Sequence, residues 1–287
     1  MINMKKTFAL MIAVFAMIVA FTSCEKEGQY MPKKKISRIV YTHSHKVGDL
    51  TISTTESERW VWGKDQLNYI DVFNSDGDKT NTFIFRYDED NRMEEVEDKE
   101  YTVKYDYDDG HLDEIEIKNK LSGRLLKKME FSYKGSKLAT IDVTTDSKGN
   151  EPLSFNPLRF VIPDEIAEMM LSNDAAKGTV RYTVTWSGKN ISGITSDAPD
   201  RSYVKWTYDE MNNPFKGFFN TAYGLDEMYS ANNAVREEYS TDGKVSVIDY
   251  NYEYSGKYPT KVKYQTESST LVPGYTLTVD NEITYQY

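Results

Sequence analysis

The segment 103–120 carries the densest group of side chains that could do acid–base or metal chemistry. It reads VKYDYDDGHLDEIEIKNK and holds six carboxylates and a histidine. Two interpretations are open, a reactive site or the turn and solvent face of a hairpin. On both sides of the Asp-Asp-Gly-His turn, apolar and charged residues alternate, which is typical of strands that bury one face. We therefore predict a hairpin whose charges serve solubility and register. The side chains concerned are Asp106, Asp108, Asp109, His111, Asp113, Glu114 and Glu116.

Two other segments have residue types that bind metals. His43 and His45 lie two positions apart, which places both imidazoles on one face of a strand, a spacing that zinc and copper sites use. A site needs a third ligand, and His111 is the only other histidine. The run Asn74–Asp78 resembles a calcium loop, but its glycine is misplaced and no glutamate follows at the twelfth position. We expect a strand end and a turn, with no metal and no cofactor.

Motifs for covalent catalysis are missing from the sequence. It has no Gly-x-Ser-x-Gly elbow, no P-loop and no dinucleotide-binding fingerprint. Among 45 acidic residues, pairs of carboxylates occur by chance, so no pair stands out as a glycosidase dyad. We expect a protein without enzymatic activity.

Four tryptophans are candidates for ligand binding. Trp60 and Trp62 share one face of a predicted strand, and Trp186 and Trp206 lie on two others. Aromatic rings exposed together on one concave surface bind sugars, whereas large aromatic residues in strands are more often core. A carbohydrate-binding module is therefore an alternative function, which the exposure of these four side chains would distinguish.

The N-terminal 23 residues predict export. They combine Lys5 and Lys6 with an apolar run of about 15 residues, too short to span a membrane, as in a secretory signal peptide. Small residues then precede Cys24, the only cysteine. This site resembles the lipobox of bacterial lipoproteins, with Phe21 where Leu is commonest. The resemblance implies that the thiol receives a diacylglyceryl group and that palmitate follows, whereas an ordinary signal peptide with an unrelated cysteine is the alternative.

Residues 24–35 are polar and predict a tether between the lipid and the folded body. Residue 25 is Glu and not the Asp associated with retention at the inner membrane, so we expect the outer membrane, on its periplasmic or surface side. Anchoring by two acyl chains is firm, since each buried methylene contributes about 0.8 kcal/mol. The net charge of −10 argues against nucleic acid as a partner. A glycan or an envelope protein is the partner class left open.

One pattern repeats through residues 36–287. An aromatic-rich strand is followed by a short Gly/Asn/Asp turn and a second strand, in a chain with 22 Tyr, 12 Phe and 4 Trp. We predict one all-β domain, a large antiparallel up-and-down meander of about 16–18 strands. A flat sheet of this size would curl or split, so we expect a closed or nearly closed barrel. The predicted hairpins cover residues 83–99, 102–118, 129–143, 180–195, 203–218 and 234–264.

Two stretches interrupt the repeat. Residues 163–173 begin with Pro-Asp-Glu and place apolar residues at helical spacing, which predicts a short amphipathic helix that plugs the sheet. Residues 217–233 predict a longer irregular loop. After them, one face of the segment 245–254 carries an aromatic stripe, formed by Ile248, Tyr250, Tyr252 and Tyr254.

Four features of the sequence carry a resemblance to a known family. They are the lipobox, the aromatic hairpins and the segments WTYDEMNNPFKGFF (206–219) and YEYSGKYPTKVKY (252–264). Together they are similar to a family of bacterial lipoproteins of unknown function with a porin-like fold. The resemblance spans most of the mature chain. It implies an antiparallel, barrel-like sheet, and it implies neither an activity nor any catalytic residue.

These patterns favour a lipid-anchored β protein with a structural, binding or accessory role at the outer membrane or cell surface. A porin-like barrel inserted in the membrane is the second alternative, which the C-terminal aromatics Tyr285 and Tyr287 favour. Spanning strands need about 9–11 residues with an apolar outer band. Most segments here are shorter and their apolar face is rich in tyrosine, so we expect a body that folds in water.

Overall fold

The computed structural model describes residues 26–47, 49–145, 178–198, 202–221, 223–241, 243–269 and 276–287. In these residues, seventeen antiparallel strands form one sheet, accompanied by a short helix, α3 (Leu225–Tyr229). None of the helices in the described residues has the length and apolar character needed to cross a membrane.

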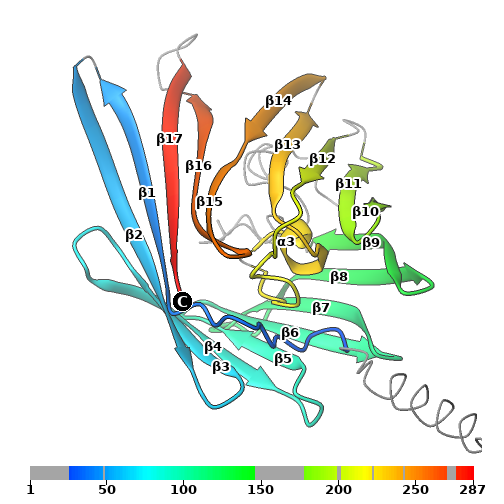
Figure 1. Ribbon diagram of the computed structural model, residues 1–287. Helices are drawn as coiled ribbons and strands as arrows, with labels where there is room; N and C mark the ends of the chain where they lie inside the picture. The colour runs from blue at the N-terminus through cyan, green and yellow to red at the C-terminus, as the bar shows by residue number, and fades with distance from the viewer. Residues whose placement is uncertain are drawn as a thin grey trace, which may run out of the picture.

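The strands follow one another around a nearly closed barrel (Figure 1). The first strand, β1 (Arg38–Val47), pairs with β2 (Leu50–Trp62) on one side and with the last strand, β17 (Thr276–Gln286), on the other. The predicted all-β meander, its strand number and its barrel form are confirmed. The other strands are β3 (Leu67–Phe73), β4 (Lys79–Tyr87), β5 (Met93–Glu97), β6 (Tyr101–Asp108), β7 (His111–Asn119), β8 (Leu125–Lys134), β9 (Lys137–Thr145), β10 (Gly178–Ser187), β11 (Asn190–Ser196), β12 (Tyr203–Tyr208), β13 (Ala234–Thr241), β14 (Lys244–Asp249), β15 (Asn251–Ser255) and β16 (Tyr258–Ser269).

Side-chain alternation decides which face of each strand is inside the barrel. In β6, Val103 and Tyr105 are buried while Lys104 and Asp106 are exposed. The turn to β7 consists of Asp109 and Gly110, whose φ angles of 46° and 83° match the twist of a tight hairpin. The segment 103–120 is therefore the hairpin that its sequence predicts.

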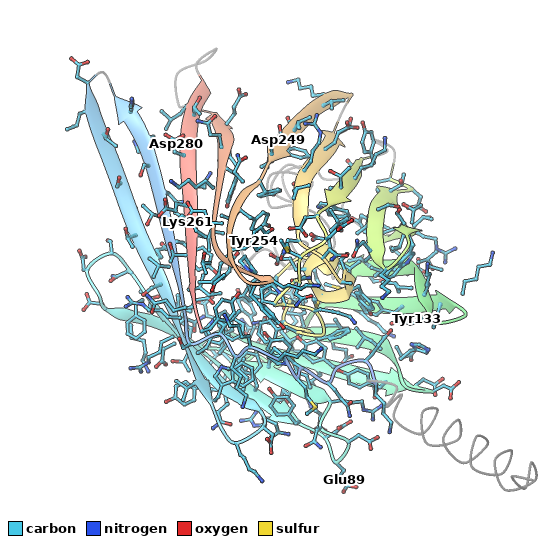
Figure 2. All side chains as sticks on the ribbon, viewed as in Figure 1. Glu89, Tyr133, Asp249, Tyr254, Lys261 and Asp280 are labelled. Carbon is cyan, nitrogen blue, oxygen red and sulfur yellow. The ribbon has the colours of Figure 1, made fainter. Side chains whose placement is uncertain are left out.

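The outer face of the barrel carries cross-strand ion pairs around most of its circumference. The charged residues alternate along their strands with the core residues, so they point away from the core, and only Asp71 of this set is itself buried, at 2% exposed. Figure 2 shows two of them, Asp249 and Lys261, on β14 and β16. We call this set the charged belt. It comprises Arg59 and Lys79 with Asp71, Arg86 with Glu95 and Glu97, Lys128 with Glu114, Arg181 with Asp142, Lys205 with Glu238, Arg236 with Asp249, and Lys261 and Lys263 with Glu282.

The barrel has an open seam between β14 and the distal part of β16. The sequence predicts one strand over 245–254, but the chain turns aside at Tyr250, whose N–H donates to the carbonyl of Val235 at 2.9 Å. As a result, β14 pairs with β13 and β15 pairs with β16, and no pairing joins β14 to β16 among the described residues. Figure 1 shows these strands diverging at the top of the view.

Within the described part of the chain, the interior is filled by residues 209–221 and 223–233, which we call the plug, drawn mainly in yellow in Figure 1. Phe218 and Phe219 are buried, and the ring centroid of Phe218 lies 4.8 Å from that of Trp60 on β2. The prediction of a strand at 214–218 is wrong, because β12 ends at Tyr208 and a turn follows Asn213. The side chain of Asn213 accepts the N–H of Phe215 at 2.9 Å and donates to two carbonyls of the plug.

Helix α3 lies within the plug, where the sequence predicts an irregular loop. The helix predicted at 163–173 lies outside the described residues. Among the described residues, the segment that plugs the interior is one that the sequence predicts mostly as a loop.

Residues 26–37, the N-terminal segment, pack between the plug and the wall of the barrel. Tyr30 and Ile36 are buried, and the hydroxyl of Tyr30 donates to the carbonyl of Pro214 in the plug at 2.9 Å. On the wall side, the carbonyl of Gly28 accepts the N–H of Met93 at 2.9 Å. Most of the stretch predicted as a tether thus lies against the folded domain.

Candidate functional site

A cavity of about 210 Å³ lies between the plug and the wall formed by β12–β17. Its lining consists of aromatic, acidic, amide and aliphatic side chains, together with Gly, Pro and Ala residues. The plug contributes α3 and residues 213–215, and the wall contributes alternate residues of its strands. Two hydrogen bonds close the neck of the plug, both at 3.1 Å: the N–H of Asp209 donates to the carbonyl of Asn233, and the N–H of Asn233 donates to the side-chain carboxylate of Asp209.

Three carboxylates line the cavity. Glu237 on β13 is only 7% exposed, and it accepts the indole N–H of Trp206 at 2.8 Å. Asp226 and Glu227 lie in the first turn of α3, where Glu227 accepts the N–H of Gly224 at 3.2 Å. Burial, and then the neighbouring charge of Glu227, raises the pKa of Asp226 to about 8. The cavity therefore brings three acidic groups together, and burial disfavours the ionisation of Asp226.

Tyrosine rings line the same wall as Glu237, opposite the carboxylates of α3. The aromatic stripe predicted on 248–254 faces the interior, and the ring centroid of Tyr250 lies 5.0 Å from that of Tyr264 on β16. Burial raises the pKa of Tyr250 well above its usual value, and the charge of Glu237 raises it further. Burial likewise raises the pKa of Tyr252, with a further contribution from Glu227. The phenols thus lie in the negative potential of the carboxylates.

Trp60 and Trp62 stack on each other on β2, with ring centroids 6.4 Å apart, whereas Trp186 and Trp206 lie on β10 and β12. Trp60 is 3% exposed and contacts the plug, while the indole N–H of Trp62 donates to the carbonyl of Ile36 at 2.6 Å. The indole N–H of Trp186 donates to the carbonyl of Leu138 at 2.8 Å. Trp206 alone lines the cavity. The four side chains pack as core and do not share an exposed platform.

The histidine pair stays apart from the third histidine. The Nδ1 of His43 lies 2.6 Å from the amide oxygen of Asn281 on β17, and His45 follows two residues later on β1. His111, on β7, lies 3.2 Å from Glu27 and stacks on Tyr133. Within the described residues, no group of three or more His, Cys, Asp and Glu side chains is arranged to hold a metal.

The calcium-like run is a turn. The side-chain oxygen of Asn74 accepts the N–H groups of Asp76 and Asp78, and Gly77 takes a positive φ of 83°. The lipidation candidate, Cys24, lies outside the described residues.

Sequence reasoning missed the carboxylates of the cavity. Asp226 sits in a stretch predicted as a loop, and Glu237 is one of two consecutive glutamates in a strand, of which Glu238 points outward. Alternation with the exposed Arg236 would have placed Glu237 inside. Nothing in the sequence signals that α3 lies opposite it.

Comparisons with known proteins support the fold. No family model matches the chain, and no curated protein matches it. The chain is similar to the crystal structure of a porin-like protein from Bacteroides uniformis, with 12% identity, 91% of this chain and 99% of the other covered, and a TM-score of 0.53. A second porin-like protein, from Bacteroides vulgatus, has 11% identity, coverages of 88% and 98%, and a TM-score of 0.45. The first similarity agrees with the porin-like barrel that the family resemblance implies, and it concerns the fold alone.

Proposed function

We propose that this protein is a lipid-anchored barrel surrounded by water, with a binding or accessory role at the outer membrane and no enzymatic activity. The charged belt is the observation that carries the proposal. A barrel inserted in a bilayer presents an apolar outer band about 25 Å tall, and each outward Lys or Arg at mid-membrane costs about 2–4 kcal/mol. Since the ion pairs recur from β2 to β17, no uninterrupted apolar band fits around these strands.

The anchor then determines how the barrel lies on the membrane. Lys26 forms an ion pair with Asp90 at 2.9 Å, in the turn between β4 and β5. Two residue steps separate Cys24 from Lys26, and they span at most about 7 Å. A lipid on Cys24 would therefore hold this turn close to the bilayer. The seam, at the top of Figure 1, lies away from the N-terminal segment and would face outward.

Membrane fractionation of the full chain, expressed with its own signal in a bacterium with two membranes, tests this proposal. The wild-type protein should pellet with membranes after a high-salt wash, and Cys24→Ala should appear in the soluble fraction. Ser23→Ala is the matched control, because it keeps a small residue before the cysteine and should stay with the membranes.

The alternative is an inserted barrel. It would be supported if Cys24→Ala still pelleted after the high-salt wash and then showed heat-modifiable gel mobility in detergent. That result would refute the water-facing barrel, whereas release of Cys24→Ala as a folded, monodisperse protein would support it.

A further inference from the structure

We propose that the cavity behind the seam binds a small organic cation, whose ammonium group lies between the carboxylates of Asp226 and Glu237 and the ring faces of the wall tyrosines. This inference deepens the binding role proposed above, and it is independent of the lipid anchor. Three observations carry it: the size of the cavity, the combination of rings with carboxylates, and the position of the seam.

The cavity has room for a small molecule and not only for water. A single water needs about 10–15 Å³ on the same measure, and the cavity measures about 210 Å³. Pockets for drug-sized ligands measure about 300–1,000 Å³. The size therefore fits a compact ligand with a few heavy atoms.

The lining has the chemistry of a cation cage. Ring faces carry negative charge density and attract ammonium groups, most strongly where water is excluded. Tyr250 and Tyr264 form one side of the cage, with ring planes inclined at 55°, and Trp206 adds an indole from β12. These three rings come from β12, from the link between β14 and β15, and from β16, so rings from three segments of the wall line one space.

The carboxylates determine the sign of the charge that the cavity presents to a ligand. Asp226 and Glu237 line the same space, and a bound cation would favour the ionised form of Asp226, whose pKa burial otherwise raises to about 8. Acidic residues in the first turn of α3 also stabilise that helix. Helix stabilisation does not account for Glu237, which enters the same space from a different element, β13. An anionic ligand would be repelled by this set, and a cation would be attracted.

The seam provides a route to this site. Ile248 and Tyr250 flank it from the β14 side, and Tyr264 flanks it from the β16 side, and all three line the cavity. No backbone pairing between β14 and β16 has to break for a ligand to pass, among the residues described. The plug can therefore stay in place during binding.

Isothermal titration calorimetry of the full chain, purified from membranes in a non-ionic detergent, tests the inference with choline as the probe. Its neutral carbon isostere, 3,3-dimethyl-1-butanol, has the same shape without the charge. Choline should bind at least about tenfold more tightly than the isostere, as expected for a desolvated cation over aromatic rings. Equal binding of the two compounds, or no binding of choline to folded protein, would overturn the proposal.

Charge-removing variants locate the site. Asp226→Asn and Glu237→Gln keep the side-chain shape. At about pH 9, where Asp226 with its raised pKa of about 8 is ionised, each should weaken choline binding about tenfold. Glu253→Gln on the exposed side of β15 is the matched control and should bind like the wild type. Circular dichroism shows which variants remain folded. Should Asp226→Asn unfold, Tyr252→Phe and Tyr252→Leu replace it, because the first keeps the ring and should retain binding while the second should lose it.

Folded variants that all bind choline like the control would also refute the site. Failure of this inference and failure of the anchoring proposal can be told apart. Calorimetry reports on the cavity of the purified protein, and fractionation of Cys24→Ala reports on the membrane attachment.

Discussion

Replacing Glu27 by alanine should loosen the N-terminal segment and destabilise the whole barrel. One oxygen of this carboxylate accepts the N–H of Leu112 at 3.0 Å and the hydroxyl of Tyr133 at 2.8 Å. The hydroxyl of Tyr229 in the plug lies 3.4 Å from the same oxygen. The other oxygen lies 3.2 Å from the Nδ1 of His111. Glu27 therefore joins the N-terminal segment, the wall and the plug at one point.

The size of the effect follows from these contacts. A hydrogen bond to a charged group contributes about 1.5–3 kcal/mol, and a buried donor left without an acceptor costs about 1–3 kcal/mol. The two phenols can still bond to each other, since their oxygens are 3.0 Å apart. The N–H of Leu112 has no such substitute in the alanine variant. Because contacts of one network are not additive, we expect the free energy of unfolding to fall by about 2–4 kcal/mol.

Urea unfolding measures this loss as a shift of the midpoint at constant slope. Glu89→Ala is the matched control, because it removes an exposed carboxylate at the tip of the β4–β5 turn (Figure 2). Glu27→Gln should lie between Glu27→Ala and the wild type, since an amide oxygen can still accept the N–H of Leu112. The proposed junction would be refuted if the free energies of unfolding of Glu27→Ala and Glu89→Ala differed by less than about 0.5 kcal/mol, the normal range for surface substitutions.

Two further substitutions test the plug and the cavity. Gly217→Ala should lower the melting temperature more than Gly77→Ala does. Both glycines have a positive φ, but a Cβ at 217 would lie 3.1 Å from the carbonyl oxygen of Gln29, whereas a Cβ at 77 would meet nothing within 4 Å. Equal melting temperatures would contradict this contact. For Asp226, folding raises the pKa from the usual 3.8 to about 8, so the folded state retains a proton that the unfolded state releases, and stability should fall as pH rises between these values. Asp226→Asn should flatten this part of the pH–stability curve, and an unchanged slope would contradict it. The other titratable groups that line the cavity are Glu227, Glu237, Tyr250, Tyr252, Tyr264 and Tyr285, and Tyr208 on β12 lies near Asp226.

Local pattern was enough to predict the wall of the barrel. Each hairpin is specified within about 20 residues by alternation and turn chemistry, as in the Asp109–Gly110 turn. Closure also followed from strand number alone. The exception is the segment 245–254. Its alternation of inward and outward side chains continues through Tyr250, although the backbone pairing is interrupted there, between β14 and β15. Alternation records which face is buried, and both halves of this segment bury the same face, so the break at Tyr250 leaves no trace in the sequence.

The plug and the cavity depend on contacts that no local pattern records. The hydroxyl of Tyr223 donates to Glu58, 165 positions earlier in the chain, at 2.6 Å. Polar composition predicted a tether at 24–35, yet Tyr30 is buried because the plug provides aromatic partners such as Phe218, with ring centroids 4.7 Å apart. The carboxylates of the cavity were missed for the same reason, since Asp226 gains its surroundings only when the plug folds against β13.

The plug also explains how a barrel of this width can carry charge outside and aromatic residues inside. Side chains alone fill a barrel of about eight strands, whereas barrels of 16–18 strands enclose an aqueous channel. In an empty barrel of seventeen strands, the inward-facing tyrosine and tryptophan rings would contact water. Such a barrel would gain from burial in lipid only if its outer face were apolar. Here Phe215, Phe218 and Phe219 of the plug, together with Tyr30, pack against those faces. The aromatic faces are thereby buried within one chain, which leaves the outer face free to carry ion pairs. The plug and the charged belt therefore depend on each other, and a variant that expels the plug should expose aromatic surface and aggregate in water.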